Sequence, residues 1–410
     1  MQGTLRDRWL MTLCVSRIML YALYMAYAAC LPVLMHAWNM SATQAGSVSG
    51  AYMLTYGFSL VGASALADRF GARRVFMWSA WSTGVTSVAF GLFARDYASA
   101  LVLYCAVALC QGGVYSPAVM LFADRYQPAV RGRAVGMLIA GTSLGYALSL
   151  LTAGVMLGLS GYRLAFAVCG VVPLAGAVMA AVALRDTPNV VHARPAGEPS
   201  LRVIRRNPDA VRLIAGYTGH SWELLGSWNW LPAFLAASLA LTGGDPTLAA
   251  ALGAGATAVM HGCGSVAAST MGSLSDRLGR RRVLLMLAVA GTALSMAMGW
   301  LVYAPFAVLV LLALVYGFVS VGDSPVLSTA LTEAVAPRHL GAALATRSVF
   351  GFGAGALAPV VFGVVLDATA PAGSPALSWG LAFASLGLGG VVAVACARGL
   401  RSGDRPAIAD

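Results

Sequence analysis

The sequence contains no lysine, so all 26 of its basic residues are arginines. Charged residues of either sign make up only 10 % of its 410 residues, whereas a soluble domain carries about a quarter. The sequence also lacks a Cys-x-x-Cys pair, a His-Glu-x-x-His zinc motif and a Walker phosphate loop. These absences argue against a zinc enzyme and against transport powered directly by ATP. We therefore expect no enzyme activity, no bound metal and no cofactor.

The residues that are present are mostly apolar: hydrophobic residues make up 59 % of the chain, and the mean hydropathy is +0.78. A membrane-spanning helix needs about 20 mostly apolar residues. Twelve segments meet this need: 10–34, 44–67, 75–94, 98–122, 132–158, 164–184, 211–238, 248–271, 283–301, 305–331, 340–366 and 376–397. The seven cysteines all fall in apolar segments, where buried structural thiols are expected. The pattern predicts an all-α membrane protein with twelve transmembrane helices.

The arginines are unevenly distributed among the loops. If both termini are cytoplasmic, 22 of the 26 arginines lie in cytoplasmic segments, and only Arg95 and Arg163 lie in the opposite loops. This is the positive-inside pattern of a multi-pass membrane protein. The net charge of +11 therefore indicates contact with a lipid bilayer rather than with nucleic acid. Heavy use of alanine, glycine and arginine suggests a bacterial source, so we expect the inner membrane.

One loop sequence occurs twice in the chain. Residues 64–74 and 272–282 share the pattern Leu-x-Asp-Arg-x-Gly-x-Arg-Arg at an offset of 208, and each copy joins two apolar segments. A second pair, Pro128-x-x-x-Gly132-x-Ala134 and Pro337-x-x-x-Gly341-x-Ala343, repeats at an offset of 209. Such duplication indicates two pseudo-symmetric six-helix bundles. We expect these bundles at residues 1–184 and 211–410, joined by a polar cytoplasmic linker at 185–210.

The repeated loops are expected to act as a cytoplasmic gate that closes in one conformation and opens in another. Glycine permits a tight turn, a carboxylate can accept hydrogen bonds from a helix N-terminus, and arginines can pair with acidic residues at nearby helix ends. A simple positive-inside anchor is the alternative. The gate residues expected on these grounds are Asp68, Arg69, Gly71, Arg73, Arg74, Asp124, Asp276, Arg277, Gly279, Arg281 and Glu333.

With twelve spans, a long central loop and this loop motif in both halves, the sequence resembles the major facilitator superfamily. The first copy departs from the family motif at Ser64 and Ala72. The resemblance implies that spans 1, 4, 7 and 10 line a central cavity and that spans 2, 5, 8 and 11 flank it. It also implies transport by alternating access and a monomeric protein.

Placing an ionisable side chain inside a membrane span costs free energy, so each such residue indicates a functional site by default. Here Arg17 lies in span 1 and Arg347 in span 11, and both suit a planar anion. Arg17 could instead snorkel to the lipid headgroups, and Arg347 could form a structural pair with Asp323. We expect four residues to be candidates for proton coupling: Glu223, Asp323, His220 and His261.

Polar and aromatic side chains recur at helical spacing beside these charges, although such stripes can also serve helix packing. The substrate-binding residues expected are Arg17, Tyr21, Tyr24, Gln111, Tyr115, Glu223, Trp230 and Arg347. The function predicted is secondary transport of a small solute, most simply a small organic or inorganic anion such as a mono- or dicarboxylate, with possible proton symport. A drug/proton antiporter and a sugar or osmolyte carrier are the alternatives. A membrane enzyme or sensor role is a more distant one.

Overall fold

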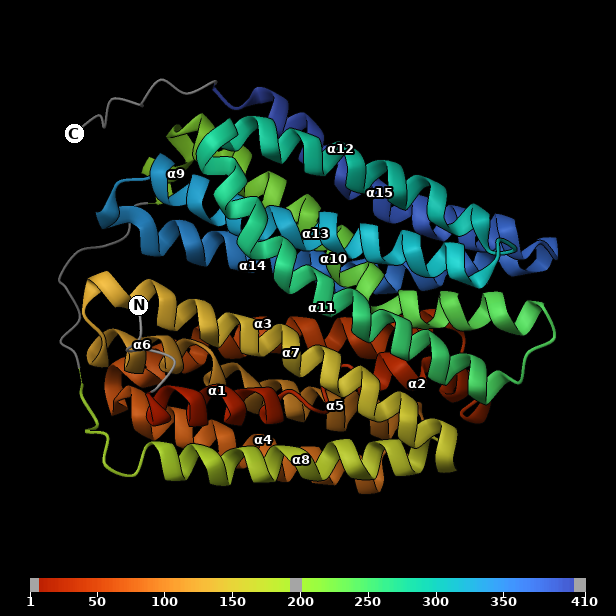
Figure 1. Cartoon of the computed structure of the whole chain (residues 1–410), viewed down its shortest axis with the longest axis horizontal. Helices are drawn as coiled ribbons and strands as arrows, with labels where there is room; N and C mark the ends of the chain where they lie inside the picture. Colours follow the sequence, from red (N-terminus) through yellow and green to blue (C-terminus); the bar gives the residue numbers. More distant parts are fainter. Residues whose placement is uncertain (1–6, 192–200, 402–410) are drawn as a thin grey trace. The chain divides into compact units, whose positions relative to one another are not determined.

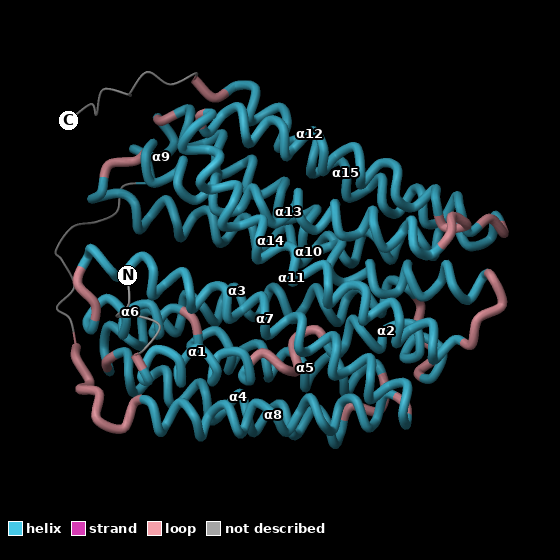
Figure 2. The backbone as a smooth tube through the Cα atoms, in the orientation of Figure 1, coloured by secondary structure: helices cyan, strands magenta, loops and turns pink. Residues whose placement is uncertain are grey.

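The computed structural model describes residues 7–191 and 201–401. In these ranges every regular element is a helix, and mostly short loops join the helices (Figure 1, Figure 2). The first elements are α1 (Arg8–Leu20), α2 (Ala26–Ala37), α3 (Ala42–Phe70), α4 (Ala72–Phe93), α5 (Tyr97–Gln111), η1 (Gly112–Val114), α6 (Ser116–Arg125), α7 (Pro128–Ser160), α8 (Tyr162–Ala183) and α9 (Leu201–Arg206). The later ones are α10 (Pro208–Leu241), α11 (Pro246–Leu278), α12 (Arg280–Met298), η2 (Gly299–Leu301), α13 (Phe306–Ala334), α14 (Pro337–Thr369), η3 (Ala370–Ala372) and α15 (Pro375–Gly399).

The prediction of an all-helical protein is confirmed for the described residues. Eight segments there are long and apolar enough to cross a membrane: Tyr97–Arg125, Ala134–Ser160, Tyr162–Ala183, Pro208–Leu241, Arg280–Leu301, Phe306–Ala334, His339–Ala372 and Pro375–Gly399. These segments coincide with eight of the twelve predicted spans. The other four predicted spans coincide with the α1–α2 pair, α3, α4 and α11.

The predicted span 1, residues 10–34, is covered by two helices rather than by one. The helix stops at Leu20 and resumes at Ala26, leaving residues 21–25 as a turn. Backbone groups that a break frees inside a membrane must find other partners. They bond to side chains of other helices: Leu20 O accepts from Gln111 Nε2 (2.7 Å), Tyr24 O accepts from the Tyr104 hydroxyl, and Met25 N donates to Ser149 Oγ (2.9 Å).

The predicted span 4, residues 98–122, coincides with one membrane-crossing segment that contains a local irregularity. α5 ends at Gln111, a short 3₁₀ turn follows, and α6 begins at Ser116. The break lies at Gly112 and Gly113, where a Cβ atom would overlap the side chains of Ser59 and Ser79. Only glycine allows the chain to come so close to neighbouring helices, and the helix is interrupted where it does so.

The predicted linker over 185–210 is partly helical, because it contains α9 and the first turn of α10. α10 begins early because Asn207 caps it, its side-chain oxygen accepting from Asp209 N (3.1 Å) and Ala210 N (3.0 Å). Residues 192–200 of the linker lie outside the described residues, as do 1–6 and 402–410, on which the predicted location of the termini depends.

The contacts divide the chain into two compact units. The first unit comprises Met1–Met40, Ala51–Pro195 and Gly244–His261, and the second comprises Ser41–Gly50, Ala196–Gly243 and Gly262–Asp410. In the first unit α4 packs along α8, and Gly91 lies against the carbonyl of Phe166. In the second unit α10 packs against α13, α14 and α15 around a core that includes Leu213, Val326 and Leu331.

Candidate functional site

Arg17 is a fully buried cation in the first unit, with only 1 % of its surface exposed. It lies near the end of α1, beside the break in span 1. Its guanidinium Nε donates to Thr142 Oγ1 on α7 at 2.8 Å, and Nη1 donates to the carbonyl oxygen of Val114 in η1 at 2.8 Å. Nη2 donates to the Tyr21 hydroxyl at 3.4 Å. An arginine this deeply enclosed does not snorkel to a headgroup region.

The groups that contact the Arg17 guanidinium are electrically neutral. Besides the hydrogen bonds, its central carbon lies 5.0 Å from the ring centroids of both Tyr21 and Tyr115. Over the described ranges, Arg17 forms no ion pair with a carboxylate. A buried charge is normally paired or metal-coordinating because desolvation is costly. Arg17 is therefore a cation whose counter-charge is not supplied by the described residues of this unit.

A cluster of tyrosines surrounds Arg17. The Tyr21 hydroxyl bonds to that of Tyr56 at 2.8 Å, and Tyr24 stacks on Tyr146 with ring centroids 4.4 Å apart. Gln111 joins this cluster, because its Oε1 accepts from the Tyr52 hydroxyl. The result is a polar, aromatic environment between α1, α3, α5 and α7.

Four of these neighbours were not among the predicted site residues. They are Tyr52, Tyr56, Thr142 and Tyr146. Tyr52 and Tyr56 are four residues apart in predicted span 2, and Thr142 and Tyr146 are four residues apart in predicted span 5. The same spacing singled out Arg17 and Tyr21 in span 1, so it was the signal available in the sequence. Their convergence on Arg17 required the packing of α3 and α7 around it.

In the second unit, Asp323 on α13 pairs with a histidine rather than with an arginine. The His220 Nδ1 atom lies 3.0 Å from Asp323 Oδ1, and His220 Nε2 lies 2.8 Å from Ser324 Oγ. The expected pairing of Asp323 with Arg347 is not formed. Arg347 instead donates from Nη1 to Ser328 Oγ at 2.8 Å.

Arg347 resembles Arg17 in its surroundings. Its guanidinium carbon lies 4.4 Å from the centroid of the Tyr217 ring. Its Nε is buried and has no hydrogen-bond partner, and Arg347 makes no ion pair with any described residue. Arg17 in the first unit and Arg347 in the second are thus both held by hydroxyl and aromatic groups.

Glu223 lies in the interior of the second unit, one turn from His220 on α10. Its Oε1 accepts from Ser295 Oγ on α12 at 2.6 Å, and Ser295 is bonded in turn to the Tyr316 hydroxyl on α13 at 2.7 Å. Both glycines near its carboxylate, Gly291 and Gly390, leave room for it. This is a position suited to holding a proton within the helix bundle.

Two other predicted site residues lie in packed surroundings. Trp230 is 0 % exposed, donates from Nε1 to the Pro359 carbonyl at 2.9 Å and stacks on Phe362. We do not retain Trp230 as a substrate contact, because its polar atom and both ring faces belong to the core. His261 belongs to the first unit, where its ring meets that of Tyr146 edge-on with centroids 5.7 Å apart.

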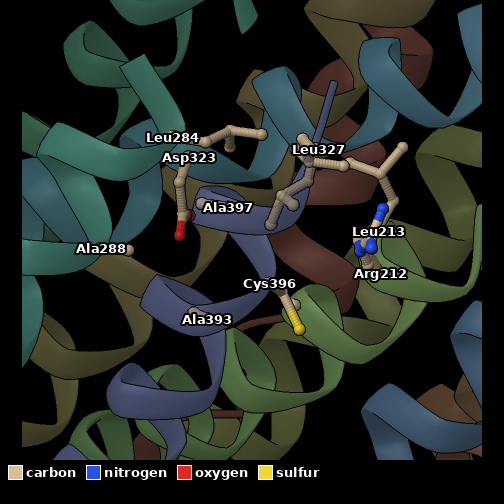
Figure 3. A pocket seen from close by; sticks show the side chains of 11 residues that line it. Arg212, Leu213, Leu284, Ala288, Asp323, Leu327, Ala393, Cys396 and Ala397 are labelled. Carbon is tan, nitrogen blue, oxygen red and sulfur yellow. The ribbon is translucent and has the colours of Figure 1, made fainter. Parts of the chain in front are cut away.

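A small cavity in the second unit is lined by Asp323 of α13 and by residues of α10, α12 and α15 (Figure 3). Arg212 and Cys396 also line it. Its volume of about 10 Å³ is near the lower limit for holding one water molecule. The cavity is therefore too small for an organic solute.

The repeated arginines bind the ends of helices within each unit. Arg73 donates to the carbonyls of Leu184 (2.9 Å) and Arg185 (3.1 Å), just after α8. The equivalent Arg281 donates to the carbonyl of Arg398 (3.0 Å) in the last turn of α15. Cations at a helix C-terminus satisfy free carbonyls and oppose the helix dipole.

The ion pairs of the second loop centre on Arg280, which was not among the predicted gate residues. Arg280 bonds to Asp276 (2.5 Å) and to Glu333 (2.9 Å). The position equivalent to Arg280 in the first copy is Ala72, so the first loop has no such cation. The predicted gate residues Arg69, Asp124 and Arg277 are exposed.

Gly71 and Gly279 both adopt a left-handed backbone, with φ of 89° and 88°, as expected for tight turns. Their surroundings differ. Asn189 of the linker fills the space beside Gly71, donating from Nδ2 to Phe70 O at 2.8 Å and accepting at Oδ1 from Arg74 N at 3.0 Å. A Cβ atom on Gly279 would meet no atom of the described residues within 4 Å. The linker thus clamps the first loop, and among the described residues no equivalent side chain fills the space beside Gly279.

Replacing Gly71 with alanine is expected to destabilise the protein more than replacing Gly279. Both changes strain a positive-φ turn at about 1 kcal/mol or more, but only Gly71→Ala also displaces Asn189 and its two hydrogen bonds, each worth about 1 kcal/mol. Thermal unfolding in detergent measures the difference. In an Asn189→Ala background, Gly71→Ala should destabilise the protein little more than Gly279→Ala does. If the destabilising effects of Gly71→Ala and Asn189→Ala instead add in full, the clamp is contradicted.

The fold and the buried charges define a multi-pass helical membrane protein with polar residues inside its bundles. Residues 13–268 match the family model of the Major Facilitator Superfamily. The chain belongs to this superfamily, so the predicted twelve-helix membrane fold is confirmed. It is a membrane transporter of a small solute, not an enzyme.

Two relatives are named as transporters. The chain is 25 % identical over 389 residues to the probable sulfoacetate transporter SauU of Cupriavidus necator, covering 88 % of this chain and 87 % of that protein. It is 24 % identical over 322 residues to a probable 4-methylmuconolactone transporter of Cupriavidus pinatubonensis, covering 74 % and 70 %.

Solved structures share the fold. A bacterial homologue of the human lysosomal transporter Spinster, in an inward-facing and unoccupied conformation, superposes with a TM-score of 0.75 at 18 % identity, covering 97 % of this chain and 96 % of that one. The nucleoside transporter NupG superposes with a TM-score of 0.73 at 13 % identity, covering 96 % and 100 %. At these identities the likeness concerns the fold alone.

Proposed function

We propose that this protein transports a small organic anion by alternating access. The observation that carries the proposal is the buried Arg17 guanidinium, which bonds only to neutral groups. An incoming carboxylate or sulfonate can supply the missing negative charge. Two of its oxygens match the planar fork that Nε and Nη2 of arginine form, and they can replace Thr142 and Tyr21 as hydrogen-bond partners.

Tyr21, Tyr24, Gln111 and Tyr115 complete the proposed binding residues around Arg17, and Arg347 is the proposed second cation. The names of the two relatives support an organic-acid substrate, because sulfoacetate and 4-methylmuconolactone are both anions at neutral pH. A neutral sugar would have no need of either arginine. A cationic drug would be repelled by them, which disfavours the drug-antiporter alternative.

Proton coupling forms a second part of the proposal. The His220–Asp323 ion pair and Glu223 are buried and lie close to one another on α10 and α13, and His220 and Glu223 are hydrogen-bonded to serine hydroxyls. Groups of this kind form proton relays in transporters. We assign proton uptake and release to them, with substrate and proton entering together. The proposed setting is a monomer in a bacterial inner membrane, with both termini cytoplasmic.

Uptake into proteoliposomes tests the proposal. We expect saturable uptake of a radiolabelled carboxylate or sulfonate, stimulated by a proton gradient that is acidic on the side of entry. A panel containing small carboxylates, sulfonates, a sugar and a cationic dye distinguishes the alternatives. Sugar or dye flux without anion flux would overturn the anion assignment, and liposomes lacking the protein are the control.

A further inference from the structure

The N-terminus of α3 is held by a carboxylate from a distant helix. Asp367, in the last turn of α14, accepts from Ala42 N at 2.9 Å through Oδ1, and from Thr43 N at 2.8 Å through Oδ2. The same Oδ2 accepts from Thr43 Oγ1 at 2.6 Å. A carboxylate at this place satisfies free backbone donors and interacts favourably with the helix dipole.

Close backbone packing continues along the same stretch of α3. A Cβ atom on Gly46 would overlap the carbonyl of Pro359, and one on Gly50 would overlap that of Ala356. One on Gly363 would overlap the carbonyl of Ala42. Glycines at these positions let α3 and α14 approach closely, as small residues do at membrane helix interfaces.

A third contact joins this stretch to α10. The Ser49 hydroxyl donates to Asn229 Oδ1, and both residues are buried. The contacts of Asp367, the glycines and Ser49 all lie within the second compact unit, which contains Ser41–Gly50 but not the rest of α3. The start of α3 is thus packed with helices from the other end of the chain, while its remainder packs in the first unit.

The start of α3 also has a local cap. Ser41 accepts from Gln44 N at 3.2 Å, so Asp367 adds a long-range contact to a helix end that is already capped in part by its own segment. The repeat-related helix α11 is capped by the residue directly before it, because Asp245 Oδ1 accepts from Leu248 N at 2.8 Å. The position that corresponds to Asp367 at the 209-residue offset is Gly158. The long-range carboxylate therefore occurs in one copy of the repeat only.

We propose that Asp367 is a latch that closes the transport pathway at the Ala42 end of α3, the end opposite the repeated loop. When Ala42 and Thr43 leave the carboxylate, the start of α3 separates from α14 and the pathway opens there. The proposal rests on the proposed alternating-access function. The group that Asp367 holds is the first turn of α3 itself, so the latch requires no ligand.

Hydrogen–deuterium exchange of the substrate-free protein in nanodiscs tests the latch. We expect Asp367→Asn to speed amide exchange in peptides covering residues 42–50 by at least tenfold. Asp245→Asn is the matched control, because it removes the same charge from the equivalent helix end without a long-range contact. It should speed exchange only near residue 246. Thr43→Val, which keeps the carboxylate and both backbone bonds, should have a smaller effect in the same direction.

A chemical readout follows the opening directly. In a Ser49→Cys background, alkylation by a membrane-impermeant maleimide should be several-fold faster with Asp367→Asn than with Asp245→Asn. Unchanged exchange over 42–50 in both Asp367→Asn and Thr43→Val would overturn the latch, even if anion transport is found. Faster exchange in a protein that transports none of the tested anions would keep the latch and reject the proposed substrate.

Discussion

Replacing Arg17 with glutamine is expected to lower the kcat/KM of anion uptake about 100-fold. Hydrogen bonds to a charged group contribute roughly 1.5–3 kcal/mol each, and losing one or two of them in the loaded state corresponds to about two powers of ten. Glutamine can still bond to the Val114 carbonyl, so the fold should persist. Initial rates of labelled anion uptake into proteoliposomes measure the effect.

Two further variants separate charge from shape at this position. Arg17→Lys keeps the charge but loses the planar fork, so we expect partial activity with a raised KM. Arg95→Gln makes the same change as Arg17→Gln at an exposed arginine outside the spans and should transport normally. If Arg17→Gln is folded and transports with wild-type KM and rate, Arg17 is not the anion site.

Replacing Asp323 with asparagine is expected to abolish accumulation driven by a proton gradient while leaving substrate exchange across the membrane largely intact. Asparagine has nearly the same shape but cannot take up a proton, and it removes the negative partner of His220. A transporter that cannot bind or release the coupled proton should change conformation only with substrate bound, so it can still exchange substrate across the membrane. Proton-driven uptake and counterflow exchange, measured on the same vesicles, give the two readouts.

Glu223→Gln shows which carboxylate carries the proton. Loss of gradient-driven uptake in only one of the two variants assigns coupling to that residue, and loss in both indicates that they act together. Asp186→Asn, at an exposed position, is the matched control. Equal gradient-driven accumulation by wild type, Asp323→Asn and Glu223→Gln would exclude these residues from coupling.

Several features of this protein were readable from the sequence because they depend on local composition. Apolar runs of about 20 residues mark membrane helices without any knowledge of their neighbours. The cost of burying a charge likewise singles out Arg17, Glu223, Asp323 and Arg347 wherever the helices pack. The repeated loop and its glycines needed only the comparison of one half of the chain with the other.

The partners of those residues were decided by the tertiary structure. Asp323 pairs with His220 and not with Arg347, and Arg280 rather than its neighbours bonds to Glu333. Hydropathy cannot show that span 1 breaks at residues 21–25, because the side chains that hold the freed backbone come from α5 and α7. Asp367 lies 324 positions from Thr43 along the chain. Hydropathy and helical spacing are properties of one segment, whereas a hydrogen bond between helices depends on how both are rotated and placed, and only packing determines that.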